Sequence, residues 1–172
     1  MKKHPNIWTF IQLIQDENGK YKLWSKNGTR GSSRLSGENM REDRGDNKDS
    51  KGYDTPQEFL DSKENKDEKT GEPEYKEGYL IPATSPQDRQ NEEGTKEELK
   101  KDYNIVKSNC VQTVQNGLRK EGKQDGSPST WSQISATLLS GTVGQLYNEK
   151  TPAKVYNRIK TQNPGGIVFK PK

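Results

Sequence analysis

Apolar residues occur in a few short clusters along this chain, and this spacing restricts the fold to a small core. Hydrophobic residues make up 25% of the 172 residues and charged residues 31%, a composition close to that of disordered proteins. The length is that of one ordinary domain, so we expect residues 1–172 to form a single unit. Its few apolar clusters must supply the core, and long polar segments must lie at the surface.

The first apolar cluster predicts a β-hairpin over residues 7–25. Apolar residues occupy both alternating sets of positions in its first strand, which predicts that both faces of this strand are buried. The pair Asn18-Gly19 is typical of a hairpin turn, and Tyr21, Leu23 and Trp24 follow in the second strand.

The longest polar segment, residues 26–77, is expected to be a mobile insertion within the domain. It is rich first in Gly, Ser and Asn and then in charged residues, with too few apolar groups to offset the entropy of ordering. One interruption is the capping box Thr55-Pro56-Gln57-Glu58, which predicts a short helix through Phe59 and Leu60.

The remainder of the chain predicts helices and short strands. A strand is expected at Tyr79–Ile81, a helical turn after Ser85-Pro86, and a separate charged helix that starts at the capping box Thr95–Glu98 and reaches about Lys101. Towards the C-terminus, the expected elements are a helix with Trp131, Ile134 and Leu138, a helix from Thr151-Pro152 with Val155, Tyr156 and Ile159, and a strand at Ile167–Phe169.

The only cysteine, Cys110, follows two good helix-capping residues, Ser108 and Asn109. Apolar residues at 111, 114 and 118 predict a helix from Cys110 to about residue 121, ending at Gly122. In the first turn, unpaired N–H groups and the positive end of the helix dipole favour a thiolate, as a nucleophile requires. The other interpretation is a small buried hydrophobe. Gly117 within this helix indicates either close packing or a tolerated glycine.

The segment Tyr103–Val114 resembles the entry to the cysteine helix of circularly permuted papain-like proteins, which are related to the NlpC/P60 and lecithin-retinol-acyltransferase-like families. Residues 79–88 resemble the strand, turn and helix that precede that segment, and residues 8–19 resemble the opening hairpin. The resemblance implies an α+β fold, with the cysteine-bearing helix packed on a small, mainly antiparallel sheet.

The chain departs from this family at the catalytic histidine, which should stand at position 8, where Trp8 is found. The only histidine, His4, lies four residues earlier and is followed by Pro5. Four residues of extended strand span roughly 13 Å, so His4 can take the same place only if the entry to the strand is irregular. Pro5 is compatible with such an entry.

The family implies that Cys110 attacks an acyl or amide carbonyl and that His4 is its base. The Cys110 N–H, with the side-chain amide of Asn109 or Gln12, would hold the oxyanion. Asn6, Thr9 and Gln12 are candidates to orient the imidazole. Substrates would be amide bonds of peptidoglycan or proteins, or acyl esters of lipids. The alternative is a catalytically inactive papain-like binding module in which Trp8 replaces the histidine.

Many members of the resembling families are toxin domains of bacterial polymorphic-toxin and type VI effector proteins. A cognate immunity protein and an upstream carrier or secretion-machine component are therefore the implied partners, and the implied location is a target cell reached through a dedicated secretion system. No signal peptide or transmembrane segment is evident, because the apolar stretch after Met1-Lys2-Lys3 is interrupted and lacks a cleavage site.

The charged residues predict solubility and no nucleic-acid partner, because 29 basic and 25 acidic residues are interleaved along the chain. One histidine and one cysteine cannot make a zinc site, and the chain has no glycine-rich phosphate loop. We therefore expect neither a metal nor a cofactor.

Overall fold

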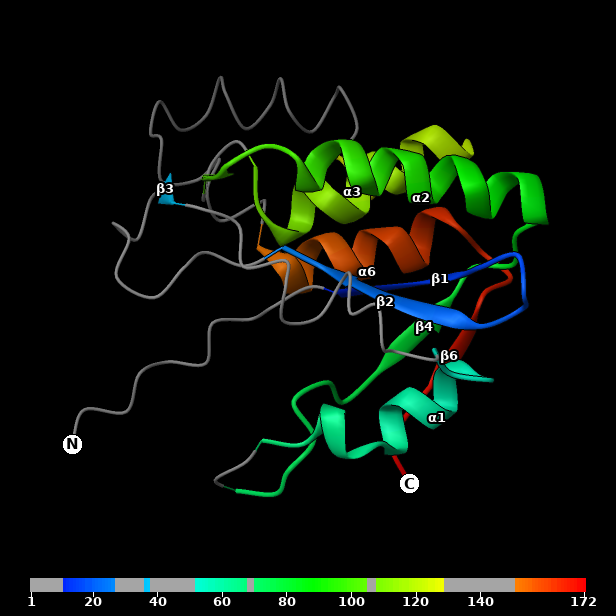
Figure 1. The fold of residues 1–172 in the computed structure, drawn as a ribbon, viewed down its shortest axis with the longest axis vertical. Helices are drawn as coiled ribbons and strands as arrows, with labels where there is room; N and C mark the ends of the chain where they lie inside the picture. Colours follow the sequence, from blue (N-terminus) through cyan, green and yellow to red (C-terminus); the bar gives the residue numbers. More distant parts are fainter. Residues whose placement is uncertain (1–10, 27–35, 38–51, 68–69, 105–107, 129–150) are drawn as a thin grey trace.

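A computed structural model describes residues 11–26, 36–37, 52–67, 70–104, 108–128 and 151–172, which form a mixed α+β fold (Figure 1). The predicted fold class is confirmed at this level. The strands in this part of the chain form three separate antiparallel pairs, β1 with β2, β3 with β5 and β4 with β6. Among the described residues, no helix has the length and apolar character to cross a membrane.

The N-terminal hairpin is formed as predicted by β1 (Ile11–Gln15) and β2 (Tyr21–Ser25), with Leu13 opposite Leu23. The Asp16 carboxylate closes the turn by accepting hydrogen bonds from the backbone N–H groups of Asn18 and Lys20, each at 2.9 Å. Gly19 has a φ of +76°, a conformation that favours glycine. Residues 7–10 of the predicted first strand lie outside the described residues.

Helices pack against both faces of β1, although Ile14 is its only fully buried residue and the others are half-buried, so the predicted burial of both faces is confirmed in part. On one face Ile14 packs with Trp24 and with Leu99 of α2 (Ser85–Leu99). On the other face the hairpin packs against Phe59 and Leu60 of α1 (Pro56–Asp61). The hairpin thus contributes side chains to two separate apolar clusters, one on each of its faces.

Thr55 caps α1 as predicted, although the Glu58 carboxylate binds the N–H of Asp54 and not that of Thr55 as a capping box requires. The helix places Phe59 and Leu60 of the polar segment 26–77 in the core. The Thr55 hydroxyl accepts a hydrogen bond from Glu58 N (3.1 Å), and the Glu58 carboxylate accepts one from Asp54 N (2.6 Å). After α1 and the short 3₁₀ helix η2 (Lys63–Asn65), the buried Asn65 side chain binds the backbone of Leu60 and Tyr75. Residues 27–35, 38–51 and 68–69, for which mobility was predicted, lie outside the described residues.

The prediction of two helices between residues 85 and 101 is wrong, because α2 runs without a break from Ser85 to Leu99. Its N-terminus is closed by Thr84, whose backbone N–H donates to Gln87 Oε1 at 2.9 Å. Thr95, predicted to cap a second helix, is fully buried inside α2, and its hydroxyl donates to Gln12 Oε1 at 3.3 Å. The Thr95 side chain therefore contacts the hairpin and does not cap a helix.

Helix α3 (Cys110–Glu121) has the predicted bounds and lies alongside α2 (Figure 1). It ends at Gly122, which has a φ of +81°. A Cβ atom on Gly117 would lie 2.1 Å from Asn91 Oδ1 and 2.7 Å from Thr95 Oγ1. A Cβ atom on Gly94 would lie 2.8 Å from the carbonyl oxygen of Asn116. The two glycines therefore permit a close helix–helix contact, which confirms close packing at Gly117.

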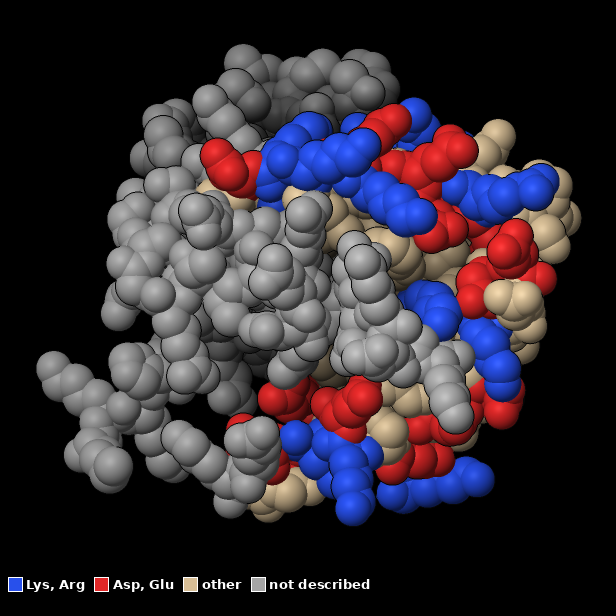
Figure 2. Space-filling model, in the orientation of Figure 1, with Lys and Arg blue, Asp and Glu red and all other residues tan. Residues whose placement is uncertain are grey.

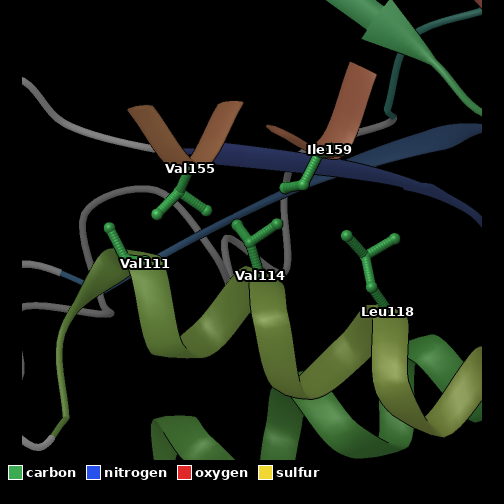
Figure 3. Close-up of a cluster of buried hydrophobic side chains, with 5 residues drawn as sticks. All are labelled: Val111, Val114, Leu118, Val155 and Ile159. Atoms are coloured by element: carbon green, nitrogen blue, oxygen red, sulfur yellow. The ribbon is translucent and has the colours of Figure 1, made fainter. Parts of the chain in front are cut away.

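The opposite face of α3 packs against α6 (Pro152–Gln162), whose bounds also match the prediction (Figure 3). Buried side chains of both helices form this cluster: Val111, Val114, Leu118, Val155 and Ile159. The short strands β4 (Gly78–Leu80) and β6 (Ile167–Phe169) are paired, and so are β3 (Ser36–Gly37) and β5 (Tyr103–Asn104). The predicted helix with Trp131 lies outside the described residues.

The cysteine helix therefore lies mainly between two helices, α2 and α6, and contacts β1 at one edge. The sequence predicted a helix packed on one sheet, and the described strands do not form a single sheet of that kind. One face of α3 is covered by α2, which Gly94 and Gly117 allow to approach closely, and the opposite face is covered by α6.

We expect Gly117→Ala to destabilise the protein by about 2 kcal/mol, because a new methyl group would displace the buried side chains of Asn91 and Thr95. Urea unfolding monitored by circular dichroism measures this difference. Gln90→Ala, at an exposed position of α2, is the control and should change stability by less than about 0.5 kcal/mol. Equal stability of the two variants would contradict a tight α2–α3 contact.

Candidate functional site

The N-terminus of α3 holds Cys110 as its first helical residue, as predicted. Asn109 is the N-cap, and its side-chain oxygen accepts hydrogen bonds from Val111 N (2.8 Å) and Gln112 N (3.4 Å). The Asn109 carbonyl in turn accepts a hydrogen bond from the Thr113 hydroxyl at 3.0 Å. These contacts fix the first turn of the helix around the cysteine.

Cys110 is half-buried and packs against the apolar cluster between α3 and α6. Val155, near the start of α6, lies beside Val111, and Ile159 lies further along, near Leu118 (Figure 3). The two helices therefore run in the same direction, and both begin at the end of the molecule that carries Cys110 (Figures 1 and 3). The positive ends of two helix dipoles thus face this end.

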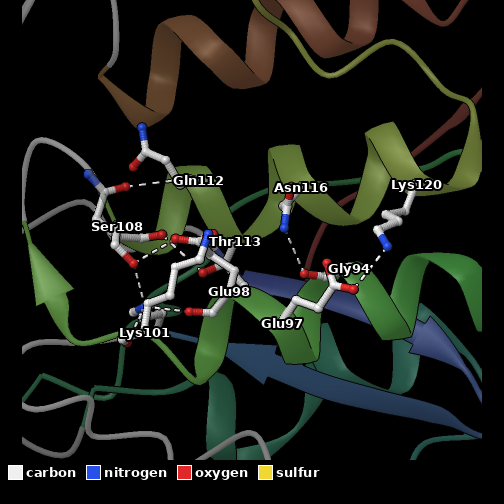
Figure 4. Close-up of polar contacts among 11 residues, drawn as sticks. Gly94, Glu97, Glu98, Lys101, Ser108, Gln112, Thr113, Asn116 and Lys120 are labelled. Carbon is white, nitrogen blue, oxygen red and sulfur yellow. Dashed lines mark hydrogen bonds and ion pairs between the residues drawn. The ribbon is translucent and has the colours of Figure 1, made fainter.

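A buried lysine lies close to the start of α3. Lys26, which follows β2, is 0% exposed. Its ammonium donates to the carbonyl oxygens of Glu98 (2.5 Å) and Lys101 (2.6 Å) and to the Ser108 hydroxyl (2.5 Å). The Ser108 hydroxyl donates to Glu98 Oε1 at 2.6 Å, while Glu98 Oε2 pairs with Lys101 at 2.6 Å. Figure 4 shows Ser108, Glu98 and Lys101 in this group, which we call the Lys26 cluster.

In the Lys26 cluster, burial disfavours the charged forms of Lys26 and Glu98, and neighbouring groups oppose this effect. Burial lowers the pKa of Lys26 from 10.5 to about 8, against the opposing effect of Glu98. Burial also works against the Glu98 carboxylate, yet hydrogen bonds from Lys101 and Ser108 leave its pKa below its ordinary value. Both groups are therefore charged at neutral pH, and the ammonium lies against the negative C-terminal end of α2.

A second buried polar group connects the hairpin to the middle of the helix pair. Gln12 Nε2 donates to Asn91 Oδ1 (2.8 Å), and Asn91 Nδ2 donates to the carboxyl group of Glu121 (2.5 Å). The single hydroxyl proton of Thr95 is shared between Gln12 Oε1 (3.3 Å) and Asn91 Oδ1 (3.4 Å). Burial raises the pKa of Glu121 from 4.5 to about 7; the hydrogen bond from Asn91 and the charge of Lys123 oppose this, and Asp88 adds to it.

The structure brings together two of the predicted site residues, Cys110 and Asn109, at the start of α3. Gln12 instead lies beside Gly117, because its partners Asn91 and Thr95 contact that glycine. Gly117 is roughly 10 Å along the helix axis from Cys110. The remaining predicted residues, His4, Asn6 and Thr9, and the substituting Trp8, lie outside the described residues.

Sequence reasoning missed the Lys26 cluster. Lysine is almost never fully buried, and Lys26 stands at the start of a long polar segment, so no local pattern indicates its burial. Ser108 was recognised only as a helix-capping residue, whereas the cap is Asn109 and the Ser108 hydroxyl is bound to Lys26 and Glu98. The sequence did contain one signal: Ser108 and Asn109 are both capping residues, but a helix needs only one. The second polar side chain therefore indicated another buried or tertiary partner.

Other parts of the described surface provide little further chemistry. No three His, Cys, Asp or Glu residues among the described residues are grouped so as to hold a metal ion. A shallow cleft of about 370 Å³ lies at the other end of α3, lined by Ile81, Pro82, Lys123 and residues 162–165. Over the described part of the face in Figure 2, basic side chains lie among acidic ones.

Comparison of the chain with protein-family models gave no match, and searches of curated proteins and of solved structures gave no significant match.

The buried Glu121 predicts a pH-dependent stability. Its raised pKa means that the folded state holds a proton which the unfolded state releases, so this stabilisation is complete below about pH 4.5 and is lost as the pH rises through 7. Glu121→Gln keeps an acceptor for Asn91 without the charge. We expect this variant to be more stable than the parent protein by up to about 3 kcal/mol at pH 8 and nearly equal at pH 4.5.

Urea unfolding of the parent protein and of Glu121→Gln between pH 4.5 and pH 8 measures the difference in their free energies of unfolding. The contributions of the other titrating groups are common to both proteins and cancel in this difference. Glu97→Gln is the control, because the Glu97 carboxylate is exposed and pairs with Lys120 at the surface. A pH-independent difference between Glu121→Gln and the parent would show that Glu121 ionises normally.

Proposed function

We propose that this protein is a cysteine-dependent hydrolase that cleaves an amide or acyl bond, with Cys110 as its nucleophile. The observation that carries the proposal is the position of Cys110, which is the first residue of α3 and is not fully buried. A helix N-terminus favours the thiolate, and the N-terminus of α6 adds a second dipole of the same sign at this end of the molecule.

In this reaction the Cys110 sulfur attacks the carbonyl carbon of the substrate and forms a covalent acyl-enzyme. The base, for which His4 is the candidate, takes the thiol proton and passes it to the leaving amine or alcohol. Water then attacks the thioester, which releases the acid product and regenerates the thiol. The Cys110 backbone N–H, with the side-chain amide of Asn109, stabilises the oxyanion. Asn6 and Thr9 remain the candidates to orient the imidazole, and Gln12 is a weaker one because its amide is bound between β1 and α2.

The permuted papain-like architecture belongs to this proposal, and so does a role as a bacterial effector or toxin domain. The support is the order of elements shared with that family: a hairpin, a strand and helix, and then a capped cysteine helix. Peptidoglycan, protein or lipid is the proposed substrate. A cognate immunity protein, a secretion-system carrier and delivery into a target cell follow from the same resemblance.

A second candidate is a non-catalytic binding module in which Trp8 stands in place of the histidine. The observation that favours it is the packing of Cys110 against the apolar cluster of α3 and α6, since cysteine also serves as a small core residue. On this interpretation Cys110→Ala changes stability and leaves binding intact.

The accessibility of the thiol separates the two candidates. If Cys110 is the nucleophile, iodoacetamide should label it in the folded protein, with a rate midpoint below the value of about 8.5 for an unperturbed thiol. Mass spectrometry of timed samples measures the rate at each pH. Protection of the thiol until urea unfolds the protein would instead favour the binding module.

Activity tests the proposal directly. Cys110→Ala and His4→Ala should each lower hydrolysis by roughly a thousandfold or more, with melting temperatures close to that of the parent protein. The substrates to test are purified peptidoglycan, denatured casein and phospholipid vesicles, with release of soluble fragments, new amino groups or fatty acid as the readout. Full activity of Cys110→Ala on the substrate that the parent cleaves would end the proposal, and full activity of His4→Ala would remove only the base.

Asn109→Asp is a further variant for the oxyanion assignment. Aspartate caps a helix as well as asparagine does, so stability should be retained while the side-chain amide is lost. We expect a lower kcat with an unchanged melting temperature. An unchanged kcat would limit the role of Asn109 to capping.

A further inference from the structure

We propose that Lys26 is a positioning residue for Cys110, because its buried ammonium holds the turn from which the cysteine helix starts. This inference rests on the proposed role of Cys110 as the nucleophile. In this assignment Lys26 acts on the cysteine through Ser108, whose hydroxyl accepts a hydrogen bond from the Lys26 ammonium.

The geometry of the ammonium supports this role. Its three acceptors come from two places in the chain, namely the C-terminal end of α2 and the residue that precedes the N-cap of α3. The connection between α2 and α3 is thereby held at both ends by one nitrogen atom, at Lys101 O (2.6 Å) and at Ser108 Oγ (2.5 Å). Because Lys26 directly follows β2, the same atom also anchors the connection to the hairpin.

Ser108 connects the Lys26 ammonium to the first turn of α3, which carries Cys110. Its hydroxyl is buried and has two partners, since it accepts from Lys26 and donates to Glu98. The next residue, Asn109, caps α3 through Val111 N and Gln112 N, and the residue after that is Cys110. Fixing Ser108 therefore fixes the cap, and the cap keeps the helix N–H groups and dipole aligned at the sulfur.

The close contact between Lys26 and Ser108 resembles a catalytic pair, but its environment excludes that role. A general base must be neutral, whereas each of the three protons of the Lys26 ammonium has an acceptor. The Ser108 hydroxyl proton is directed to Glu98, and Ser108 is 5% exposed, so a substrate carbonyl could not reach it. The group is thus a satisfied structural network of the kind that fixes geometry.

Three variants of the full chain test the proposal. Ser108→Ala removes the hydroxyl that links Lys26 to the cap, and Lys26→Met removes the ammonium with little change in side-chain length. Lys101→Met is the matched control. It also removes one positive charge from the Lys26 cluster, but the Lys101 side chain is exposed and its backbone carbonyl still accepts from Lys26.

The first readout is native-state hydrogen exchange of individual amides measured by NMR. In Ser108→Ala and Lys26→Met we expect exchange at Val111 and Gln112 to rise by about fivefold to tenfold relative to Leu118, since one to two hydrogen bonds to the cap segment are lost. Lys101→Met should leave this ratio unchanged. The second readout is the pH midpoint of iodoacetamide labelling of Cys110, which should move upward in the first two variants only.

A uniform rise in exchange along α3, with no change in the Val111-to-Leu118 ratio, would mean that the Lys26 cluster supports general stability only and would overturn the proposal. Should Lys26→Met fail to fold, Ser108→Ala decides the question, with Ser108→Thr expected to restore protection because it keeps the hydroxyl. The exchange readout does not depend on catalysis. Failure of the proposed hydrolase is seen separately, as unchanged hydrolysis in Cys110→Ala.

Discussion

The close contact between α2 and α3 determines how the rest of the described structure is arranged. Gly94 and Gly117 remove the side chains that would otherwise keep the two helix backbones apart. With α2 held against one face of α3, the other face packs against α6, and the hairpin β1–β2 is brought against α2. The direction of α2 also places its C-terminal carbonyls near the start of α3, where Lys26 can bind both segments.

Buried polar networks supplement the small apolar core of this chain. The group of Gln12, Asn91, Thr95 and Glu121 crosses the interface between hairpin and helices, and the Lys26 cluster closes one end of it. Polar groups buried in this way must be hydrogen-bonded, and their directional contacts specify one arrangement where apolar side chains would permit others. Burial raises the pKa of the Glu121 carboxyl group to about 7, so the stability of this arrangement depends on pH near neutrality.

The proposed chemistry depends on the same arrangement. Cys110 is positioned by a capped helix turn, and that turn is in contact with a buried ammonium which also binds the end of α2. A nucleophile gains from such rigidity, because its orientation need not be established at each turnover. The half-buried thiol also packs on the apolar cluster, so a structural role for Cys110 uses the same surroundings, and reactivity measurements decide between them.

The sequence by itself determined the local elements: the hairpin with its Asn18-Gly19 turn, the capped α1, the bounds of α3 between its caps Asn109 and Gly122, and α6 after Thr151. These are set by caps, turns and apolar spacing within a few residues. Only the tertiary structure decided the continuity of α2, the burial of Lys26 and the place of Gln12 beside Gly117. The local sequence around Lys26 and Gln12 gives no sign of burial, since their partners lie 72 to 83 residues away along the chain. These residues become neighbours only when the hairpin packs against α2 and the start of α3.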